Sequence, residues 1–220
     1  MAAFVLGACG RKAPPGDTGL ALPPAPAGET SLRQPPAEVA GAAYMPLAAG
    51  NSWTYRASSV IGDISETKER TFEVFDDEND SFRIEEAGKG LINAVRMYYA
   101  VQDDGVMVGR GMLGAVKTEY DPPAVLLPTT FGPRAQWEWQ GTSGGHPVAM
   151  TSTCEGMETV TVPAGTYECL RIHRVFGGKV VMRHWHAEGV GIVKAVITRP
   201  AGGRFPPSNE VLELLSSQIR

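Results

Sequence analysis

The sequence predicts a mainly β protein with little helix. Short segments rich in aromatic and β-branched residues alternate with polar residues, and turn residues interrupt them about every ten positions. No long window shows the period of an amphipathic helix. The chain from residue 44 to residue 220 is long enough for one domain with a full hydrophobic core. These observations together favour a single antiparallel β body.

The expected strands follow one another through the whole of that body. They are Ser52–Ser58, Lys68–Asp76, Ser81–Ala87, Ala94–Gln102, Gly105–Arg110, Ala115–Tyr120, Gln136–Gly141, Val148–Cys154, Glu158–Val162, Thr166–Val175, Lys179–His186, Gly191–Thr198 and Glu210–Ser217. Asp103-Asp104-Gly105 and Gly177-Gly178 supply residues that accept the positive φ of tight hairpins. A single helical turn is expected near Pro123–Leu127, between prolines. The closing segment fits a strand or an end helix, and the strand completes an antiparallel meander.

The N-terminus has the features of a lipid anchor. Leu6-Gly7-Ala8-Cys9 follows a short apolar leader and resembles a bacterial lipoprotein signal, in which Cys9 is lipidated with palmitate-type acyl chains and becomes the mature N-terminus. No basic residue precedes Cys9, so residues 1–9 are expected to be a truncated signal. The alternative is a cytosolic N-terminus that contains a cysteine. The resemblance also implies that Gly10 after the cysteine, rather than Asp, directs the protein to the outer membrane, facing the periplasm.

A segment rich in Pro, Ala and Gly separates this anchor from the body. It covers residues 10–43 and contains too little apolar surface to offset the entropy of ordering. We therefore expect a disordered tether from residue 10 to residue 43 and a β domain from residue 44 to residue 220. The net charge of −4, with both signs interspersed, provides no basic stripe for phosphates, so nucleic acid is not an expected partner.

Cys154 and Cys169 leave the question of a disulfide open. An oxidising periplasm favours a bridge between two remaining cysteines. In a hairpin that turns at Pro163-Ala164-Gly165, however, the two would lie about five residues out of register, on the order of 17 Å. Bridged Cα atoms lie within about 7 Å of each other. A bridge would therefore need a bend at Gly156.

Three segments of the body resemble a group of uncharacterised bacterial secreted and lipid-anchored proteins. Residues 46–55 match the pattern PLxxGNxWxY, residues 158–167 match ETVTVPAGTF with Tyr167 at the final position, and residues 185–194 match WxAxGVGxVK. The resemblance implies a single, strongly curved antiparallel sheet, a half-barrel or open barrel, similar to periplasmic carriers of lipids and lipoproteins. His184, His186 and Glu188 depart from the pattern, because aromatic residues and a proline are usual there.

The histidines are one candidate site. A Gly177-Gly178 turn would place His173, His184 and His186 on one face of a hairpin, where three imidazoles could bind zinc. Arg171 on the same face would repel a cation, so solvated histidines are the default expectation. The opposite face is the expected core, and it carries Leu170, Ile172, Val181 and Trp185.

No enzyme motif is present, and no cofactor or catalytic residue is expected. The first hypothesis is a non-enzymatic envelope protein that binds a lipid, another hydrophobic ligand or a protein partner on a concave sheet. Its ligand-binding residues would be Met97, Tyr99, Met107, Trp137, Trp139 and Met150. The second hypothesis is a structural or assembly module with a filled core. The third is a metal-binding protein that uses the histidine cluster.

Overall fold

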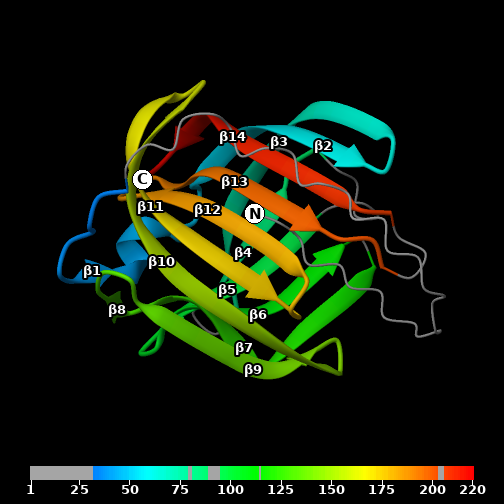
Figure 1. Cartoon of the computed structure of the whole chain (residues 1–220), viewed down its shortest axis with the longest axis horizontal. Coiled ribbons are helices and arrows are strands. Elements are labelled where there is room, and N and C mark those ends of the chain that lie inside the picture. Colours follow the sequence, from blue (N-terminus) through cyan, green and yellow to red (C-terminus); the bar gives the residue numbers. More distant parts are fainter. Residues whose placement is uncertain (1–31, 79–80, 89–94, 114, 203–205) are drawn as a thin grey trace.

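The computed structural model describes residues 32–78, 81–88, 95–113, 115–202 and 206–220. Within these ranges, twelve antiparallel strands close into one barrel (Figure 1). Around the barrel the strands are β2 (Ser52–Ile61), β3 (Ile64–Asp77), β4 (Ser81–Glu86), β5 (Val95–Gln102), β6 (Gly105–Leu113), β7 (Val116–Pro128), β9 (Gln136–Ser143), β10 (His146–Val162), β11 (Gly165–Phe176), β12 (Val180–Ala187), β13 (Gly191–Arg199) and β14 (Ser208–Gln218). The remaining elements are β1 (Val39–Ala40), β8 (Thr130–Phe131) and the 3-10 helix η1 (Gly41–Tyr44).

The barrel is closed, so the expected half-barrel or open barrel is wrong, whereas the mainly β class is confirmed. Each strand pairs with the next around the barrel, and the last strand, β14, pairs with the first, β2, from Ser208 opposite Ile61 to Gln218 opposite Ser52. Closure satisfies the backbone hydrogen-bonding groups that the edges of an open sheet would leave exposed. The closing segment is a strand, in agreement with the expectation.

The expected helical turn near Pro123–Leu127 is wrong, because these residues belong to the long strand β7. The ladder between β6 and β7 shifts register twice, between Val106 and Met107 and again between Val108 and Arg110. A proline lacks the N–H that a regular ladder needs, and irregular positions of this kind accommodate it. The prolines therefore mark a break in the ladder and do not bound a helix.

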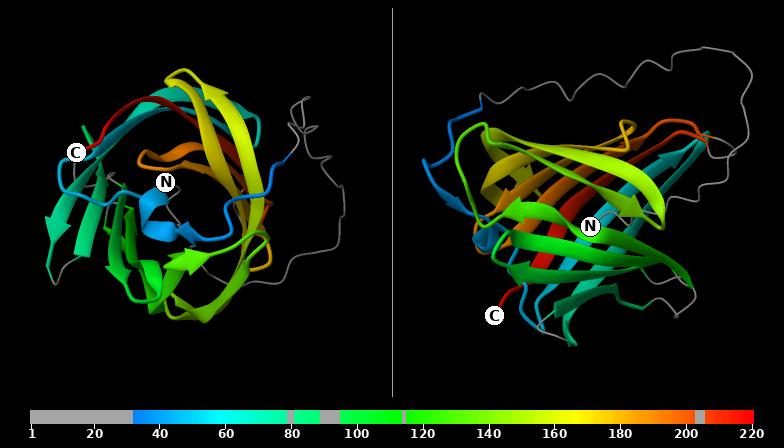
Figure 2. Two further views of the ribbon diagram at one scale, coloured as in Figure 1. Left: turned by 90° about the vertical axis from the view of Figure 1, so that its left-hand side faces the viewer. Right: turned by 90° about the horizontal axis from the view of Figure 1, so that it is seen from below.

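The described N-terminal segment covers one end of the barrel. Arg33 forms a bridge with Met157, β1 pairs with β8, and η1 lies within the ring of strands in the left view of Figure 2. Val39 and Tyr44 are buried. Arg33, β1 and η1 therefore pack against the barrel. The anchor at Cys9 and most of the expected tether lie outside the described residues.

The interior of the barrel is largely filled by inward-facing side chains. The largest fully buried ones are Tyr55, Phe72, Ile84, Leu127, Met150, Leu170, Ile172, Phe176, Met182, Ile197, Leu212 and Leu214. In a strand every second residue faces the same side, so this set gives one continuous core inside the barrel. No helix in the described part of the chain is long and apolar enough to cross a membrane.

Candidate functional site

The histidines do not come together as expected, because the hairpin of β11 and β12 pairs one residue away from the predicted register. Phe176 lies opposite Val180, so the turn contains Lys179 as well as the two glycines. A shift of one residue exchanges the two faces of a strand. His184 lies opposite Ile172, while His173 lies opposite Arg183 on the other face. No group of three potential ligands suited to a metal ion occurs among the described residues.

His184 and His186 are therefore core residues and not solvated ones. They are 6% and 2% exposed, and their rings lie 5.9 Å apart between centroids. The expected core face is also divided between the two sides. Leu170 and Ile172 face inward with these histidines, whereas Trp185 pairs with Arg171 on the outer face and donates to Glu158 Oε2 at 2.8 Å.

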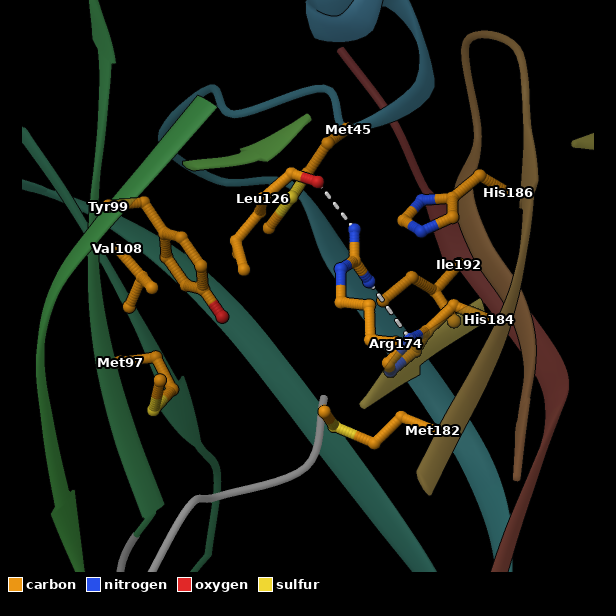
Figure 3. A pocket seen from close by; sticks show the side chains of 10 residues that line it. All are labelled: Met45, Met97, Tyr99, Val108, Leu126, Arg174, Met182, His184, His186 and Ile192. Atoms are coloured by element: carbon orange, nitrogen blue, oxygen red, sulfur yellow. Dashed lines mark hydrogen bonds between the residues drawn. The ribbon is translucent and has the colours of Figure 1, made fainter. Parts of the chain in front are cut away.

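A cavity of about 40 Å³ lies beside the two histidines. It is mostly apolar and lies between two walls of the barrel (Figure 3). One wall supplies Met97, Tyr99, Val108 and Leu126 from β5, β6 and β7, the other supplies Arg174, Met182, His184, His186 and Ile192 from β11, β12 and β13, and Met45 follows η1. The volume exceeds the minimum for one water molecule, about 10–15 Å³. It is far below the roughly 300 Å³ at which sites for drug-sized ligands begin.

Among the described residues, Arg174 is the only arginine or lysine that lines this cavity, and it is 4% exposed. One terminal nitrogen donates to His184 Nδ1 at 3.0 Å and the other to the Leu126 carbonyl at 2.6 Å. Within the part of the chain that the structure describes, its Nε has no hydrogen-bond partner and no carboxylate forms an ion pair with it. Burial lowers the pKa of Arg174 to about 10, so the group keeps its charge at neutral pH.

The two histidines are neutral at physiological pH. Burial, together with the Arg174 charge, holds the pKa of His184 well below its usual range and lowers the pKa of His186 to about 3. Because Arg174 always donates, His184 Nδ1 accepts and its proton resides on Nε2. His186 Nδ1 donates to the Tyr44 carbonyl at 3.1 Å, which leaves Nε2 as a buried acceptor without a partner in the described part of the chain. Arg174 therefore provides the positive charge of the site.

Tyr99 faces Arg174 across the cavity. Figure 3 shows its hydroxyl directed toward the wall that carries the guanidinium. Burial raises the pKa of Tyr99 well above its ordinary value, so the hydroxyl stays protonated and remains a donor. The cavity thus combines one uncompensated cation and one hydroxyl donor with an apolar lining.

Of the six residues expected to bind a ligand, Met97 and Tyr99 line the cavity. Met107, Trp139 and Met150 are buried without reaching it, and Trp137 is half-buried. The indole of Trp139 donates to the Pro122 carbonyl at 2.9 Å, and that of Trp137 donates to the Val125 carbonyl at 3.3 Å. These indoles hold the irregular part of β7 in place.

Arg174 is not among the site residues predicted from the sequence, although its position carries a signal. Arg174 shares one face of β11 with Leu170, Ile172 and Phe176 at alternating positions. Strand residues two positions apart face the same side of a sheet, so a lone arginine that alternates with large apolar residues is expected to be buried together with them.

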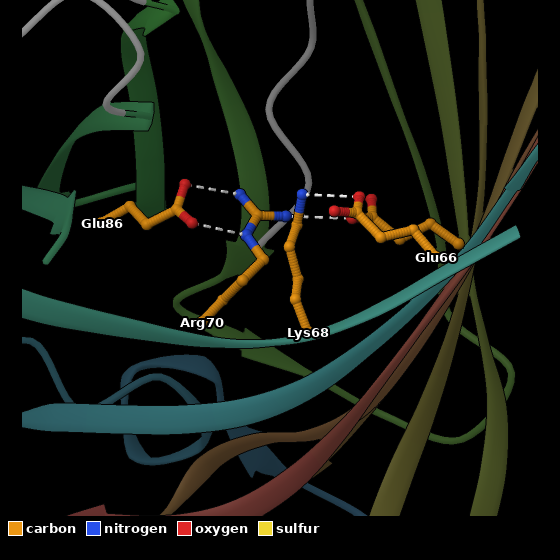
Figure 4. A network of polar contacts seen from close by, with 5 residues as sticks. Glu66, Lys68, Arg70 and Glu86 are labelled. Carbon is orange, nitrogen blue, oxygen red and sulfur yellow. Dashed lines mark hydrogen bonds and ion pairs between the residues drawn. The ribbon is translucent and has the colours of Figure 1, made fainter. Parts of the chain in front are cut away.

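A second buried arginine lies on β3, where its charge is neutralised (Figure 4). Arg70 is 9% exposed and makes two bonds to Glu86, of 2.9 and 3.0 Å. Its remaining terminal nitrogen donates to Glu210 at 2.9 Å. Glu66 and Lys68, on the same strand, form a further, exposed pair at 3.0 Å. This region is a satisfied ion-pair network.

Cys154 and Cys169 are free and buried. Cys154 lies opposite Ile172 and Cys169 opposite Glu158, so the two are three residues apart along β11. That offset is about 10 Å at the rise of a strand, beyond the reach of a disulfide. Burial raises the pKa of Cys169 to about 12, which keeps its thiol protonated and unreactive.

No family model matches the chain, and no curated protein matches it. Two solved structures are similar to it, each with 12% sequence identity and a TM-score of 0.36. One is a predicted lipoprotein from Parabacteroides distasonis, with 80% of this chain and 98% of that chain covered. The other is a predicted exported protein with a YmcC-like fold from Bacteroides fragilis, with 79% of this chain and 97% of that chain covered. The closed barrel is defined by the pairing of its own strands.

Proposed function

We propose that this protein is a non-enzymatic, lipid-anchored protein of the bacterial envelope that binds a ligand inside its barrel. The observation that carries the proposal is Arg174, a buried cation beside a cavity with no carboxylate partner among the described residues. An unpaired buried charge is costly, and such groups are retained mainly where they act. Met45, Met97 and Met182 line the same cavity and can change rotamer to admit an occupant.

The anchor is the second part of the proposal. Cys9 within Leu6-Gly7-Ala8-Cys9 would be lipidated, and the segment that follows would link it to the barrel at the periplasmic face of the outer membrane. Labelled palmitate should be incorporated when the chain is expressed with a complete signal. It should not be incorporated into the variant Cys9→Ala. Equal labelling of both forms would contradict an anchor at this cysteine.

Ligand binding is tested by native mass spectrometry of the full chain with Cys9→Ala, which removes the need for detergent. We expect a 1:1 adduct in the purified protein, or its return when a solvent-extracted sample is mixed with envelope lipids. A chain that carries no adduct before extraction and gains none afterwards would contradict the proposal.

A filled core supports a second function, an assembly module that binds another envelope protein. The apolar residues Ile61 and Ile64 at the tip of the β2–β3 hairpin are 48% and 72% exposed. A photocrosslinker at Ile64 should then capture one defined partner in intact cells, while a crosslinker at the exposed Phe75, on the same strand, should not. Loss of that product in Ile61→Glu would support the assembly function, and its persistence would contradict it.

A further inference from the structure

We propose that the cavity binds a carboxylate, which Arg174 and Tyr99 would hold by hydrogen bonds while Met97, Val108 and Met182 contact the carbon skeleton. This inference rests on the proposed function and specifies the class of its ligand. All five residues line the same cavity, and Figure 3 shows Arg174 projecting from one wall toward the other.

Arg174 differs from Arg70 in the charges that surround it. Arg70 and Arg174 are both buried, but Arg70 has two carboxylates within 2.9–3.0 Å and Arg174 has none among the described residues. His184 and His186 are neutral and cannot neutralise or compete with the guanidinium. A ligand with one negative charge would complete at Arg174 the pairing that the protein itself supplies at Arg70.

The hydrogen bonds of Arg174 also point to a carboxylate. His184 and the Leu126 carbonyl engage the two terminal nitrogens of Arg174 and fix the plane of the guanidinium. The Nε–H has no partner among the described residues, and Arg174 is only 4% exposed. The protonated hydroxyl of Tyr99 faces it from the opposite wall. Two donors that face one space suit the two oxygens of a carboxylate.

Size and charge together favour a carboxylate over a phosphate. A phosphate monoester carries a charge of about −1.5 to −2 at neutral pH, so it would leave uncompensated negative charge against one guanidinium in an apolar interior. A cavity of about 40 Å³ is small, which suits a compact head group.

Two sources can supply that group. One is a short free carboxylate, and the other is a fatty acid whose chain displaces the methionine side chains toward the end covered by η1.

Titration calorimetry on the full chain with Cys9→Ala separates these sources. The probes are butyrate, dodecanoate, dodecanol and dodecyltrimethylammonium, which vary chain length and head-group charge independently. We expect a carboxylate to bind 1:1 and dodecanol to bind at least about tenfold more weakly, the scale of a charged hydrogen bond. If butyrate binds and dodecanoate does not, the ligand is a short carboxylate. If dodecanoate binds, the ligand is a fatty acid.

Two variants assign the binding to this site. Arg174→Met should weaken carboxylate binding at least about tenfold. Arg183→Met is the matched control, because it removes the same charge from an exposed position on the outer face of β12 and should leave binding unchanged.

If Arg174→Met does not fold, Tyr99→Phe removes one donor and should weaken binding by about threefold or more. The carboxyl resonance of [1-¹³C]dodecanoate should shift in the wild type and return toward its free value in the variant.

The outcomes separate the inference from the function on which it rests. If dodecanol binds as tightly as dodecanoate and Arg174→Met changes neither, the carboxylate site is overturned and ligand binding stands. If only the cationic amphiphile binds, the charge argument is overturned in the same way. If no probe binds any form of the protein and no adduct co-purifies with it, both proposals fall.

Discussion

Arg70 and Arg174 both face the interior of this barrel, and their surroundings differ. Arg70 on β3 is held by Glu86 from β4 and Glu210 from β14, whereas Arg174 on β11 meets a carbonyl oxygen and a neutral imidazole. Both are more than nine-tenths buried. Arg70 is paired with carboxylates from β4 and β14, whereas Arg174 lies beside a cavity and has no carboxylate partner among the described residues. Removing one partner from the first arrangement would leave buried charges unpaired, whereas the second arrangement is the one that we propose meets a ligand.

Removal of the compensated arginine should have the largest effect. Arg70→Met leaves Glu86 and Glu210 without their cation in a buried setting. Breaking a buried pair in this way costs about 3–5 kcal/mol. The free energy of unfolding, measured by urea denaturation at pH 7, should fall by that amount.

Arg56→Met is the control for this comparison. Arg56 also pairs with a glutamate on β14, Glu213 at 2.8 Å, but its side chain is 46% exposed. Exposed pairs contribute about 0–1 kcal/mol. Similar losses in Arg56→Met and Arg70→Met would show that burial does not distinguish the two networks.

Acidification should affect the Arg174 region through its histidines. The pKa values of His184 and His186 are lowered in the folded protein, to about 3 for His186, because both are buried beside the guanidinium. The unfolded chain, with a histidine pKa of about 6.5, therefore binds more protons between these values, and stability falls as the pH falls. For His186 the free energy of unfolding should drop by about 1.6 kcal/mol between pH 6.5 and 5, and His184 should lower it further in the same direction.

The variant His186→Gln isolates one histidine. It should reduce the pH-dependent slope over that range while leaving the Arg70 network intact. A free energy of unfolding that stays constant from pH 7 to pH 5 in the wild type would show that these imidazoles are not buried in neutral form.

The two regions also differ in what the sequence could predict. The strands of the body, including β14, follow from alternation and turn residues, and the structure confirms most of them. Closure could not be predicted in this way, because it depends on pairing between β2 and β14, at opposite ends of the body. Such a contact leaves no local pattern, so the alternation of each strand is the same in an open and a closed sheet.

The site was missed for a more local reason. A two-residue turn at Gly177-Gly178 would pair Phe176 with Lys179, whereas the observed turn includes Lys179 and pairs Phe176 with Val180. That one residue turns His173 away from His184 and His186 and brings Arg174 onto their face. Hairpin register depends on turn length, and composition alone does not determine whether such a turn has two or three residues.

A smaller effect is expected where the N-terminal segment covers the cavity end of the barrel. A Cβ added at Gly41 would lie 2.1 Å from the Pro128 carbonyl oxygen, so Gly41→Ala must displace η1. Overpacking of this kind costs about 1–3 kcal/mol. Hydrogen exchange should accelerate in residues 39–45. Gly109→Ala, whose Cβ would meet no atom within 4 Å, should change little, and equal exchange in both variants would contradict a tightly seated cover.

The smallest change in stability is expected from removal of the uncompensated arginine. Arg174→Met eliminates an unpaired buried charge, which favours folding, but it also leaves His184 Nδ1 and the Leu126 carbonyl without their donor. These opposing contributions should leave the ligand-free protein within about 1 kcal/mol of the wild type in the same urea experiment. A loss as large as that in Arg70→Met would mean that Arg174 is a structural residue and would remove the basis for a ligand site. Near-equality with the wild type would mean that the fold does not need this charge, and that its presence has to be explained by what it binds.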